Sequence, residues 1–224
     1  MNDNYWKTIN MNRDITASET IKPYVIVKRI LDILFSILFL IPLIILSVVI
    51  KIIYLLNRNT DSIFYNQIRI GKDGKEFEIY KFRTMNSNAE IELKKLLEDE
   101  NNKEEWIQFH KLKQDPRITK FGLFLRKSSN DEFPQFINVL KGDMSIVGPR
   151  PLVPGELEMH NGDKLYWKVK PGITGWWACN GRSDTPYDER LKQEYYYINN
   201  VSFLLDLKII FKTIICIFKK AGAR

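Results

Sequence analysis

The chain has 224 residues, of which 45% are hydrophobic and 27% are charged. This length and balance suit one domain with a modest core and exclude a disordered tail and a polytopic membrane protein. Lysine and arginine number 34 against 27 aspartates and glutamates, so the formal net charge is +7. That excess predicts an anionic partner: phosphate, nucleotide, nucleic acid or acidic lipid. The only cysteines, Cys179 and Cys216, are too few for a disulfide framework or a cysteine-built zinc site and favour a reducing compartment.

Residues 1–27 are polar and lack clear periodicity, which predicts a loose extension. Residues 33–50 carry no charge, and a straight helix of this length spans roughly 27 Å, close to the thickness of a hydrocarbon core. Pro42, near the middle of this run, is expected to kink or break the helix. Basic residues flank both ends, and since they favour the cytoplasmic side, a helix that enters and returns satisfies both flanks. Hydropathy alone leaves a spanning helix and a re-entrant helix open.

Periodicity and turn residues predict the next elements. Residues 63–83 alternate partly and are interrupted by the turn-forming residues 71–74, which indicates two strands joined by a turn. Residues 88–113 carry periodic apolar side chains among Glu and Lys, which predicts one or two amphipathic helices, and residues 189–198 predict another helix. No internal repeat or low-complexity linker divides the chain, so we expect a single folded unit.

The C-terminal residues 203–220 combine many apolar side chains with three lysines, Lys208, Lys212 and Lys219, that share one helical face. Such a basic amphipathic pattern suits a helix that lies in a membrane interface. It suits equally a helix packed on the protein core with a solvated lysine edge. The sequence leaves these two interpretations open.

Several common kinds of site are absent from the sequence. It contains neither a GxxxxGK phosphate loop nor a GxGxxG dinucleotide fingerprint. Its only histidines, His110 and His160, are too few for a histidine-rich metal site, and neither lies in a GxSxG-like context. The basic residues are dispersed and no base-stacking motif accompanies them, so nucleic acid is not the expected partner.

One acidic pair in the second half of the chain carries the chemically informative pattern. Ser129 or Asn130 is suited to cap a helix that begins at Asp131 and Glu132, with Pro134 in its first turn, where a missing N–H costs little. Two carboxylates at a helix N-terminus have an ordinary explanation, because they complement the helix dipole. The dipeptide alone therefore says little about function.

The basic residues around the pair change this interpretation. Arg126 lies five residues upstream of Asp131, and Arg150 lies between two prolines; arginine binds phosphate in a bidentate manner. A carboxylate repels phosphate unless the two share a divalent cation, and Mg²⁺ commonly binds in this way. One carboxylate can then ligate the metal while the other attacks phosphorus. The pattern is thus consistent with covalent phosphoryl transfer.

Taken together, the motifs of this chain resemble those of the bacterial sugar transferases, the monotopic polyprenyl-phosphate phosphoglycosyl transferases. The motifs follow one another over roughly residues 28–224, and their order and spacing are specific although each is weak alone. The matching motifs are Lys28-Arg29-x-x-Asp32, Lys81-Phe-Arg-Thr-Met85, Asp115-Pro-Arg-Ile-Thr119, Asp131-Glu132-Phe-Pro-Gln135, Asn138-Val-Leu-Lys-Gly-Asp-Met-Ser145, Gly148-Pro-Arg-Pro151, Lys170-Pro-Gly-Ile-Thr-Gly175, Asn180-Gly-Arg182 and Leu205-Asp-Leu-Lys208.

The resemblance implies that a nucleotide-diphosphate sugar, usually a UDP-sugar, gives its sugar phosphate to a polyprenyl phosphate. Asp131 would be the nucleophile that attacks the sugar-proximal phosphate and releases UMP, and Glu132, together with Asp131, would ligate Mg²⁺. Five basic residues would bind substrate phosphates: Arg126, Arg150, Arg182, Lys81 and Arg83. For Lys81 and Arg83, a structural ion pair is the alternative role.

The resemblance also implies an α+β, mainly helical fold in a small monotopic membrane enzyme, without the four-helix N-terminal region of the larger members. After the extension at 1–27, a re-entrant membrane helix broken at Pro42 would occupy residues 28–57. A cytosolic catalytic domain would occupy 58–202, and an amphipathic interfacial helix and tail 203–224. The expected location is the cytoplasmic face of the bacterial inner membrane, and homodimers occur in the family.

A non-enzymatic, membrane-anchored module that recruits partners through its basic surface is the alternative from another functional class. An inactive relative usually loses the acidic pair or the arginines, and this sequence keeps them all. It departs from the family pattern at Asn130, Phe133, Ala178 and Cys179, and we expect sugar preference to depend on the region of Ala178. Neither the sugar nor the polymer, whether O-antigen, capsule, exopolysaccharide or glycoprotein glycan, follows from the sequence.

Overall fold

The computed structural model describes residues 17–109, 112, 114–160, 162–181 and 185–219. Helices dominate this part of the chain, and its strands form two small two-stranded sheets. The prediction of a mainly helical fold with few strands is confirmed. Most of the predicted N-terminal extension, residues 1–16, lies outside the described residues.

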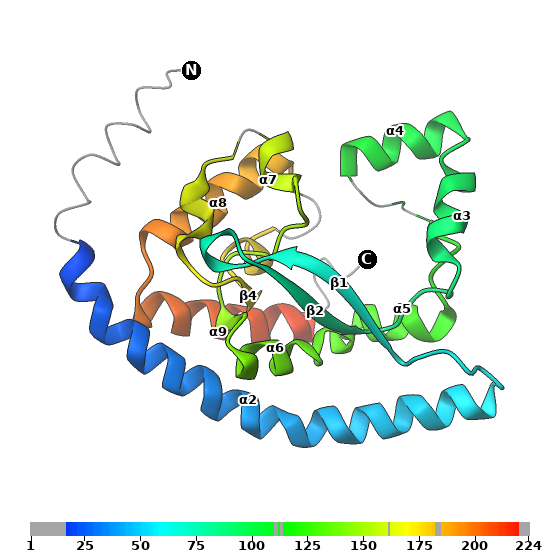
Figure 1. The fold of residues 1–224 in the computed structure, drawn as a ribbon, viewed down its shortest axis with the longest axis horizontal. Helices are drawn as coiled ribbons and strands as arrows, with labels where there is room; N and C mark the ends of the chain where they lie inside the picture. The colour runs from blue at the N-terminus through cyan, green and yellow to red at the C-terminus, as the bar shows by residue number, and fades with distance from the viewer. Residues whose placement is uncertain (1–16, 110–111, 113, 161, 182–184, 220–224) are drawn as a thin grey trace.

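The longest element is helix α2, Ala17–Leu56, which curves along one side of the molecule (Figure 1). Its segment Tyr24–Leu56 is long and apolar enough to cross a membrane, by length and composition alone. The helix begins ahead of the predicted boundary at residue 28 and is continuous through Pro42. The predicted helix break at Pro42 is therefore wrong.

Packing on both sides of Pro42 explains why the helix continues. A proline inside a helix removes one backbone hydrogen bond and costs roughly 3 kcal/mol. Before the proline, the ring of Phe39 stacks on that of Phe136, with centroids 4.6 Å apart. Directly after it, Leu43 is buried in a hydrophobic cluster that includes Phe82 and Leu125. Both halves of α2 are thus held against the same folded body, which offsets the cost of the proline.

Strands β1, Phe64–Ile70, and β2, Glu76–Phe82, form an antiparallel hairpin in which Phe64 faces Phe82. The turn between them contains the 3-10 turn η1, Lys72–Gly74, where Asp73 has a left-handed φ of 59°. Two strands joined by a turn at 71–74 are thereby confirmed.

The open edge of β2 is completed by helix α6, Gln135–Lys141, instead of a third strand. The Asn138 side chain accepts a hydrogen bond from the Tyr80 N–H at 3.0 Å and donates one to the Glu78 carbonyl at 2.6 Å. The amide thus replaces the groups that a neighbouring strand would offer. This contact fixes α6, and the acidic pair before it, relative to the hairpin.

Helices α3, Ala89–Leu96, and α4, Glu100–Phe109, confirm the prediction of one or two helices within residues 88–113. In Figure 1, α3 rises at the right of the molecule and α4 turns back across the top. Helix α5, Lys120–Lys127, then returns the chain to the body and leads into the acidic pair.

The rest of the chain alternates short turns with two longer helices. Strands β3 and β4 pair in parallel, with Ser145 opposite Gly172. Helix α8 confirms the helix predicted at residues 189–198. The element bounds are η2 Asn130–Glu132, β3 Ser145–Val147, α7 Glu156–Met159, η3 Lys164–Lys168, β4 Gly172–Thr174, η4 Trp177–Cys179, α8 Tyr187–Asn199 and α9 Phe203–Lys219.

Helix α9 packs one face on the core and exposes another. Leu205 and Ile209 are buried in the cluster formed with α8. Lys208 and Lys212 share a face, as predicted, and their ammonium groups lie 5.4 and 4.8 Å from the ring centroid of Trp176. A second face is apolar and exposed, with Phe203, Leu204, Leu207, Phe211 and Ile214. Packing of α9 on the protein core is therefore confirmed, and its placement in a membrane interface stays a prediction for the exposed apolar face.

A buried aspartate, Asp206, joins α9 to α8 and α2. Its carboxylate accepts a hydrogen bond from the Tyr197 hydroxyl of α8 at 2.8 Å. It also binds the Tyr24 hydroxyl and forms an ion pair with Lys28, both on α2. Because the side chain is only 5% exposed in an apolar setting, these partners are what make its burial tolerable.

Candidate active site

The acidic pair lies on η2, a single 3-10 turn between α5 and α6, and not in the first turn of an α-helix as predicted. Ser129 precedes it in the left-handed region, with φ 56°, and its side chain forms no capping hydrogen bond. Helix α6 begins only at Gln135, immediately after Pro134. The left-handed residue costs about 1–2 kcal/mol, and it turns the pair toward the hairpin and α5.

The electrostatic surroundings distinguish Asp131. Burial raises the pKa of its carboxyl and the charge of Glu132 raises it further, whereas Lys81 and Arg126 lower it. Lys81 also forms an ion pair with Glu132, with 3.0 Å between Nζ and Oε1. A carboxylate with a raised pKa is more basic, and therefore a better nucleophile once ionised. The structure thus brings Lys81, Arg126 and the acidic pair together.

Arg126 is held by a hydrogen bond to Thr84, a residue to which the sequence assigned no role. Its Nε donates to the Thr84 hydroxyl oxygen at 2.9 Å, and burial lowers the pKa of its guanidinium. Behind it, Arg117 and Asp115 form a buried ion pair at 2.6 Å. Thr84 lies in the Lys81–Met85 motif, but a threonine beside two basic residues carries no signal of its own that it binds an arginine.

Arg150 approaches the pair from the second half of the chain. Its guanidinium lies over the ring of Trp177, with 5.8 Å to the centroid. Burial lowers its pKa and the charge of Arg190 lowers it further, while the carboxylates of Glu156 and Glu132 act in the opposite direction. Glu132 thus exerts an electrostatic influence on Arg150, smaller than that of Glu156.

Arg83 is placed differently from the other predicted phosphate-binding residues that the structure describes. Arg83 donates from Nε to the Ser62 carbonyl at 2.9 Å and from Nη2 to the Phe64 carbonyl at 3.4 Å. These bonds hold the start of β1, so Arg83 has a structural role, though not the ion pair given as its alternative. Lys81 does form the alternative ion pair, but with a member of the acidic pair itself. Arg182 lies outside the described residues.

The acidic pair is compatible with Mg²⁺. No group of three or more His, Cys, Asp or Glu side chains in the described part of the chain is arranged to hold a metal ion. Magnesium, however, usually takes one or two carboxylates and completes its octahedron with water and substrate phosphate. Asp131 and Glu132 supply this donor set, beside basic side chains suited to the phosphates.

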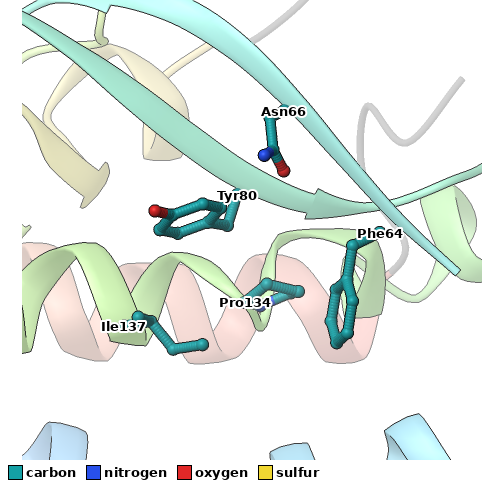
Figure 2. Close-up of a pocket in the computed structure, with 5 residues that line it drawn as sticks. All are labelled: Phe64, Asn66, Tyr80, Pro134 and Ile137. Atoms are coloured by element: carbon teal, nitrogen blue, oxygen red, sulfur yellow. The ribbon is translucent and has the colours of Figure 1, made fainter. Parts of the chain in front are cut away.

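An apolar pocket lies beside the pair, between the hairpin and α6 (Figure 2). Its volume is about 300 Å³. Pro134, two residues after Glu132, forms one wall, and the Phe64 and Ile137 side chains point toward the ribbon of α2 in Figure 2. Asn66 and Tyr80 complete the lining.

The family model of the bacterial sugar transferases matches residues 23–220 of this chain. The chain belongs to this family. It is 44% identical over 198 residues to the undecaprenyl-phosphate galactose phosphotransferase of Salmonella typhimurium, a match that covers 88% of this chain and 41% of that protein. It is 42% identical over 200 residues to the exopolysaccharide production protein ExoY of Sinorhizobium fredii, covering 88% of this chain and 87% of that protein.

A third relative is the UDP-glucose:undecaprenyl-phosphate glucose-1-phosphate transferase of Escherichia coli. The identity is 40% over 161 residues, which cover 68% of this chain and 32% of the relative. The chain spans about two fifths of the length of several curated relatives that it matches. The match to ExoY, in contrast, extends over most of both proteins.

Proposed function

We propose that this protein transfers a sugar-1-phosphate from a UDP-sugar to a polyprenyl phosphate, through a covalent phosphosugar on Asp131, to initiate a bacterial glycoconjugate. The observation that carries the proposal is the partly buried Asp131 carboxyl, whose pKa is raised by burial and by Glu132 and lowered by Lys81 and Arg126. The names of the relatives from Salmonella typhimurium and Escherichia coli support the same reaction class and lipid acceptor.

The first half-reaction forms a bond between an Asp131 carboxylate oxygen and the sugar-proximal phosphorus. The bond from this phosphorus to the bridging oxygen breaks, and UMP leaves with the electron pair. Arg126 and Arg150 would bind the diphosphate, and the ion pair between Lys81 and Glu132 would hold Glu132 beside the nucleophile. Asp131 and Glu132 would hold Mg²⁺, which when bound supplies positive charge that offsets the repulsion between carboxylate and phosphate.

The second half-reaction regenerates the carboxylate. An oxygen of the polyprenyl phosphate attacks the phosphorus of the phosphosugar, the bond from phosphorus to Asp131 breaks, and a polyprenyl diphosphate sugar is released. No net proton transfer is required between phosphate oxygens, since the entering and leaving groups are both oxyanions. Asp131 with its raised pKa serves as nucleophile in the first step and leaving group in the second.

We also propose a monotopic arrangement with the catalytic body on the cytoplasmic side, and the placement of α2 supports the first part, that both its ends lie on one side. Near its start, Arg29 donates to the Val139 carbonyl at 2.5 Å and to the Leu140 carbonyl at 3.0 Å, both at the end of α6. Near its end, Ile50 and Tyr54 are buried in the same body. A helix that crosses a bilayer would carry one of these ends away from the other by about 30 Å of hydrocarbon. Contacts at both ends with one body favour a helix that dips in and stays on one side.

The exposed apolar side chains of α2 and α9 supply a surface for the membrane. On α2 they include Leu34, Leu38, Ile41, Ile45 and Val48, all at least half exposed. The outward apolar face of α9 adds to this area. Monomeric soluble proteins rarely expose apolar surface on this scale, so it suits the lipid that also carries the acceptor.

Mass spectrometry of the intact protein, mixed with Mg²⁺ and a panel of UDP-sugars, tests the proposal. We expect a mass increase equal to one phosphosugar, located on Asp131, and equimolar release of UMP. The variant Asp131→Asn should form no adduct, because an amide is a poor nucleophile toward phosphorus.

Two other outcomes would contradict the proposal. Because the mixture contains no lipid acceptor, UMP release without an adduct would point to direct attack of water on the donor and not to a covalent intermediate. No adduct and no UMP release with any nucleotide sugar would favour the alternative, a membrane-anchored recruitment module.

A further inference from the structure

The backbone of residues 149–151 is held by four different elements. Arg150 has the only backbone N–H in this segment, because its two neighbours are prolines. That N–H donates to Oε1 of Glu194 on α8 at 3.1 Å. The Arg150 carbonyl accepts from the hydroxyl of Tyr166 on η3 at 2.9 Å. The backbone N–H and the backbone carbonyl of Arg150 are thus both hydrogen-bonded to side chains from elsewhere in the chain.

The two prolines are held in the same manner. The Pro149 carbonyl accepts from the Gly172 N–H at 2.9 Å, at the start of β4. The Pro151 carbonyl accepts from Nη1 of Arg69 on β1 at 3.1 Å. We call the four residues that bind this segment, Arg69, Tyr166, Gly172 and Glu194, the Arg150 clamp.

Burial makes Glu194 the unusual member of the clamp. Its side chain is 1% exposed, and Oε2 has no hydrogen-bond partner among the described residues. Burial raises the pKa of Glu194 to about 7, against the lowering effect of the Arg150 N–H and of the Arg190 and Arg150 charges. A buried carboxyl with one unsatisfied oxygen is expensive, and an apolar residue would fill the same space at lower cost. The stability of the fold alone therefore gives no reason for a carboxyl here, whereas its hydrogen bond with the Arg150 N–H does.

The clamp leaves the guanidinium of Arg150 available. Among the described residues, no carboxylate forms an ion pair with it. The neighbouring Arg190 behaves differently, since it is paired with Glu156 at 3.3 Å and is 6% exposed. Arg150 thus has a fixed backbone and a guanidinium that lies over Trp177 without an ion-pair partner among the described residues, and the charge of Glu132 acts on it.

We propose that Glu194 and Tyr166 are positioning residues that fix the backbone of Arg150, so that its guanidinium faces the diphosphate of the nucleotide sugar beside the acidic pair. This inference rests on the proposed function. Its physical basis is preorganisation: a guanidinium on a rigid backbone binds charge without first being ordered, whereas a mobile one loses part of its binding energy in ordering.

A double-mutant cycle separates positioning from a general structural role. Tyr166→Phe removes a single hydroxyl, and we expect the kcat/KM for the UDP-sugar to fall about five- to tenfold, the effect of one lost hydrogen bond. In an Arg150→Ala background, the same replacement should have no further effect, because the residue on which it acts has lost its charge. Tyr195→Phe is the matched control: it removes a hydroxyl that bonds to the Asp163 backbone, and it should leave kcat/KM unchanged.

Hydrogen exchange of the protein without donor gives a second readout. Glu194→Leu should accelerate exchange at the Arg150 amide. Glu194→Gln, which keeps an acceptor oxygen without the charge, should preserve slow exchange.

The results that overturn the inference are specific. An undiminished effect of Tyr166→Phe in the Arg150→Ala background would mean that Tyr166 acts through the fold. Unchanged exchange in Glu194→Leu would mean that the clamp does not hold the segment. If the wild-type protein reacts with no donor, the proposed function fails, while the exchange measurement still decides whether the clamp exists.

Discussion

Lys81 governs the charge balance of the acidic pair more directly than any other described side chain. Its ammonium is paired with Glu132, and its charge also opposes the two effects that raise the pKa of Asp131. In the proposed reaction only the ionised carboxylate attacks phosphorus, so this pKa would set the pH at which the first half-reaction begins to fail on the acid side. One lysine on β2 therefore influences both carboxylates.

Lys81→Met should move the acid limb of the pH–rate profile to higher pH. The sign follows from the charges: removal of a nearby cation destabilises the Asp131 carboxylate and raises its pKa further. The rate of adduct formation, measured as UMP release between pH 5 and 9, reports the limb. Lys141→Met on α6, whose ammonium bonds the Tyr80 hydroxyl, is the control and should leave the limb in place. An unmoved limb in Lys81→Met would show that the lysine does not tune Asp131.

At the scale of elements, α5 packs very closely on the segment that follows the hairpin, where Gly122 contacts the backbone of Thr84. A Cβ placed on Gly122 would lie 2.0 Å from the Thr84 carbonyl oxygen, a backbone atom that cannot easily move. The Thr119 N–H donates to the same carbonyl at 3.0 Å, and the Thr84 hydroxyl accepts from Arg126. Packing at this glycine therefore sets the position of Arg126, which the proposed function assigns to substrate binding.

Gly122→Ala should destabilise the protein by about 1–3 kcal/mol through overpacking. Helix propensity alone predicts the opposite, a gain of roughly 1 kcal/mol for alanine over glycine, so the sign of the change identifies the dominant effect. The midpoint of thermal unfolding in detergent measures it, and Leu123→Ala, at an exposed position of the same helix, should change it little. A raised midpoint in Gly122→Ala would mean that the close approach relaxes freely.

At the scale of the whole molecule, α2 and α9 both expose apolar side chains, and Asp206 connects these two helices with α8. Under the proposed function these apolar faces rest in the membrane. Both ends of α2 contact one body, so the depth of this helix in the lipid would then set the height of Asp131 relative to the membrane. A donor from the cytosol and an acceptor in the leaflet would meet there.

Cysteine labelling tests this topology. In a background with Cys179 and Cys216 replaced by alanine, a cysteine at position 20 and another at position 98, between α3 and α4, should both react only from the cytoplasmic side. The chain before and after the apolar part of α2 then lies on the same face of the membrane, as basic residues on both flanks favour. Labelling of position 20 from the periplasm would show that α2 spans the bilayer.

The sequence was sufficient for elements with strong local signals. The hairpin, α8 and α9 follow from alternation, turn residues and helical periodicity, all of which are properties of neighbouring residues. The motifs also identified the acidic pair and its basic neighbours Arg126 and Lys81, which the structure brings together. The prediction that the pair lies in the first turn of an α-helix was wrong, because Ser129 adopts a left-handed φ that a capping pattern does not reveal.

By itself, therefore, the sequence determined the family, the apolar segment and the residues that can carry phosphoryl chemistry, since these depend on residue type and order. Only the tertiary structure decided that α2 continues through Pro42, because the compensating contacts come from Phe136 and Phe82, far along the chain. Only the structure separated Arg83, which holds the hairpin, from Lys81 two residues earlier. The +7 charge of the sequence is a sum over residues. Whether a given cation meets a carbonyl, a carboxylate or a substrate phosphate depends on which distant segments fold beside it.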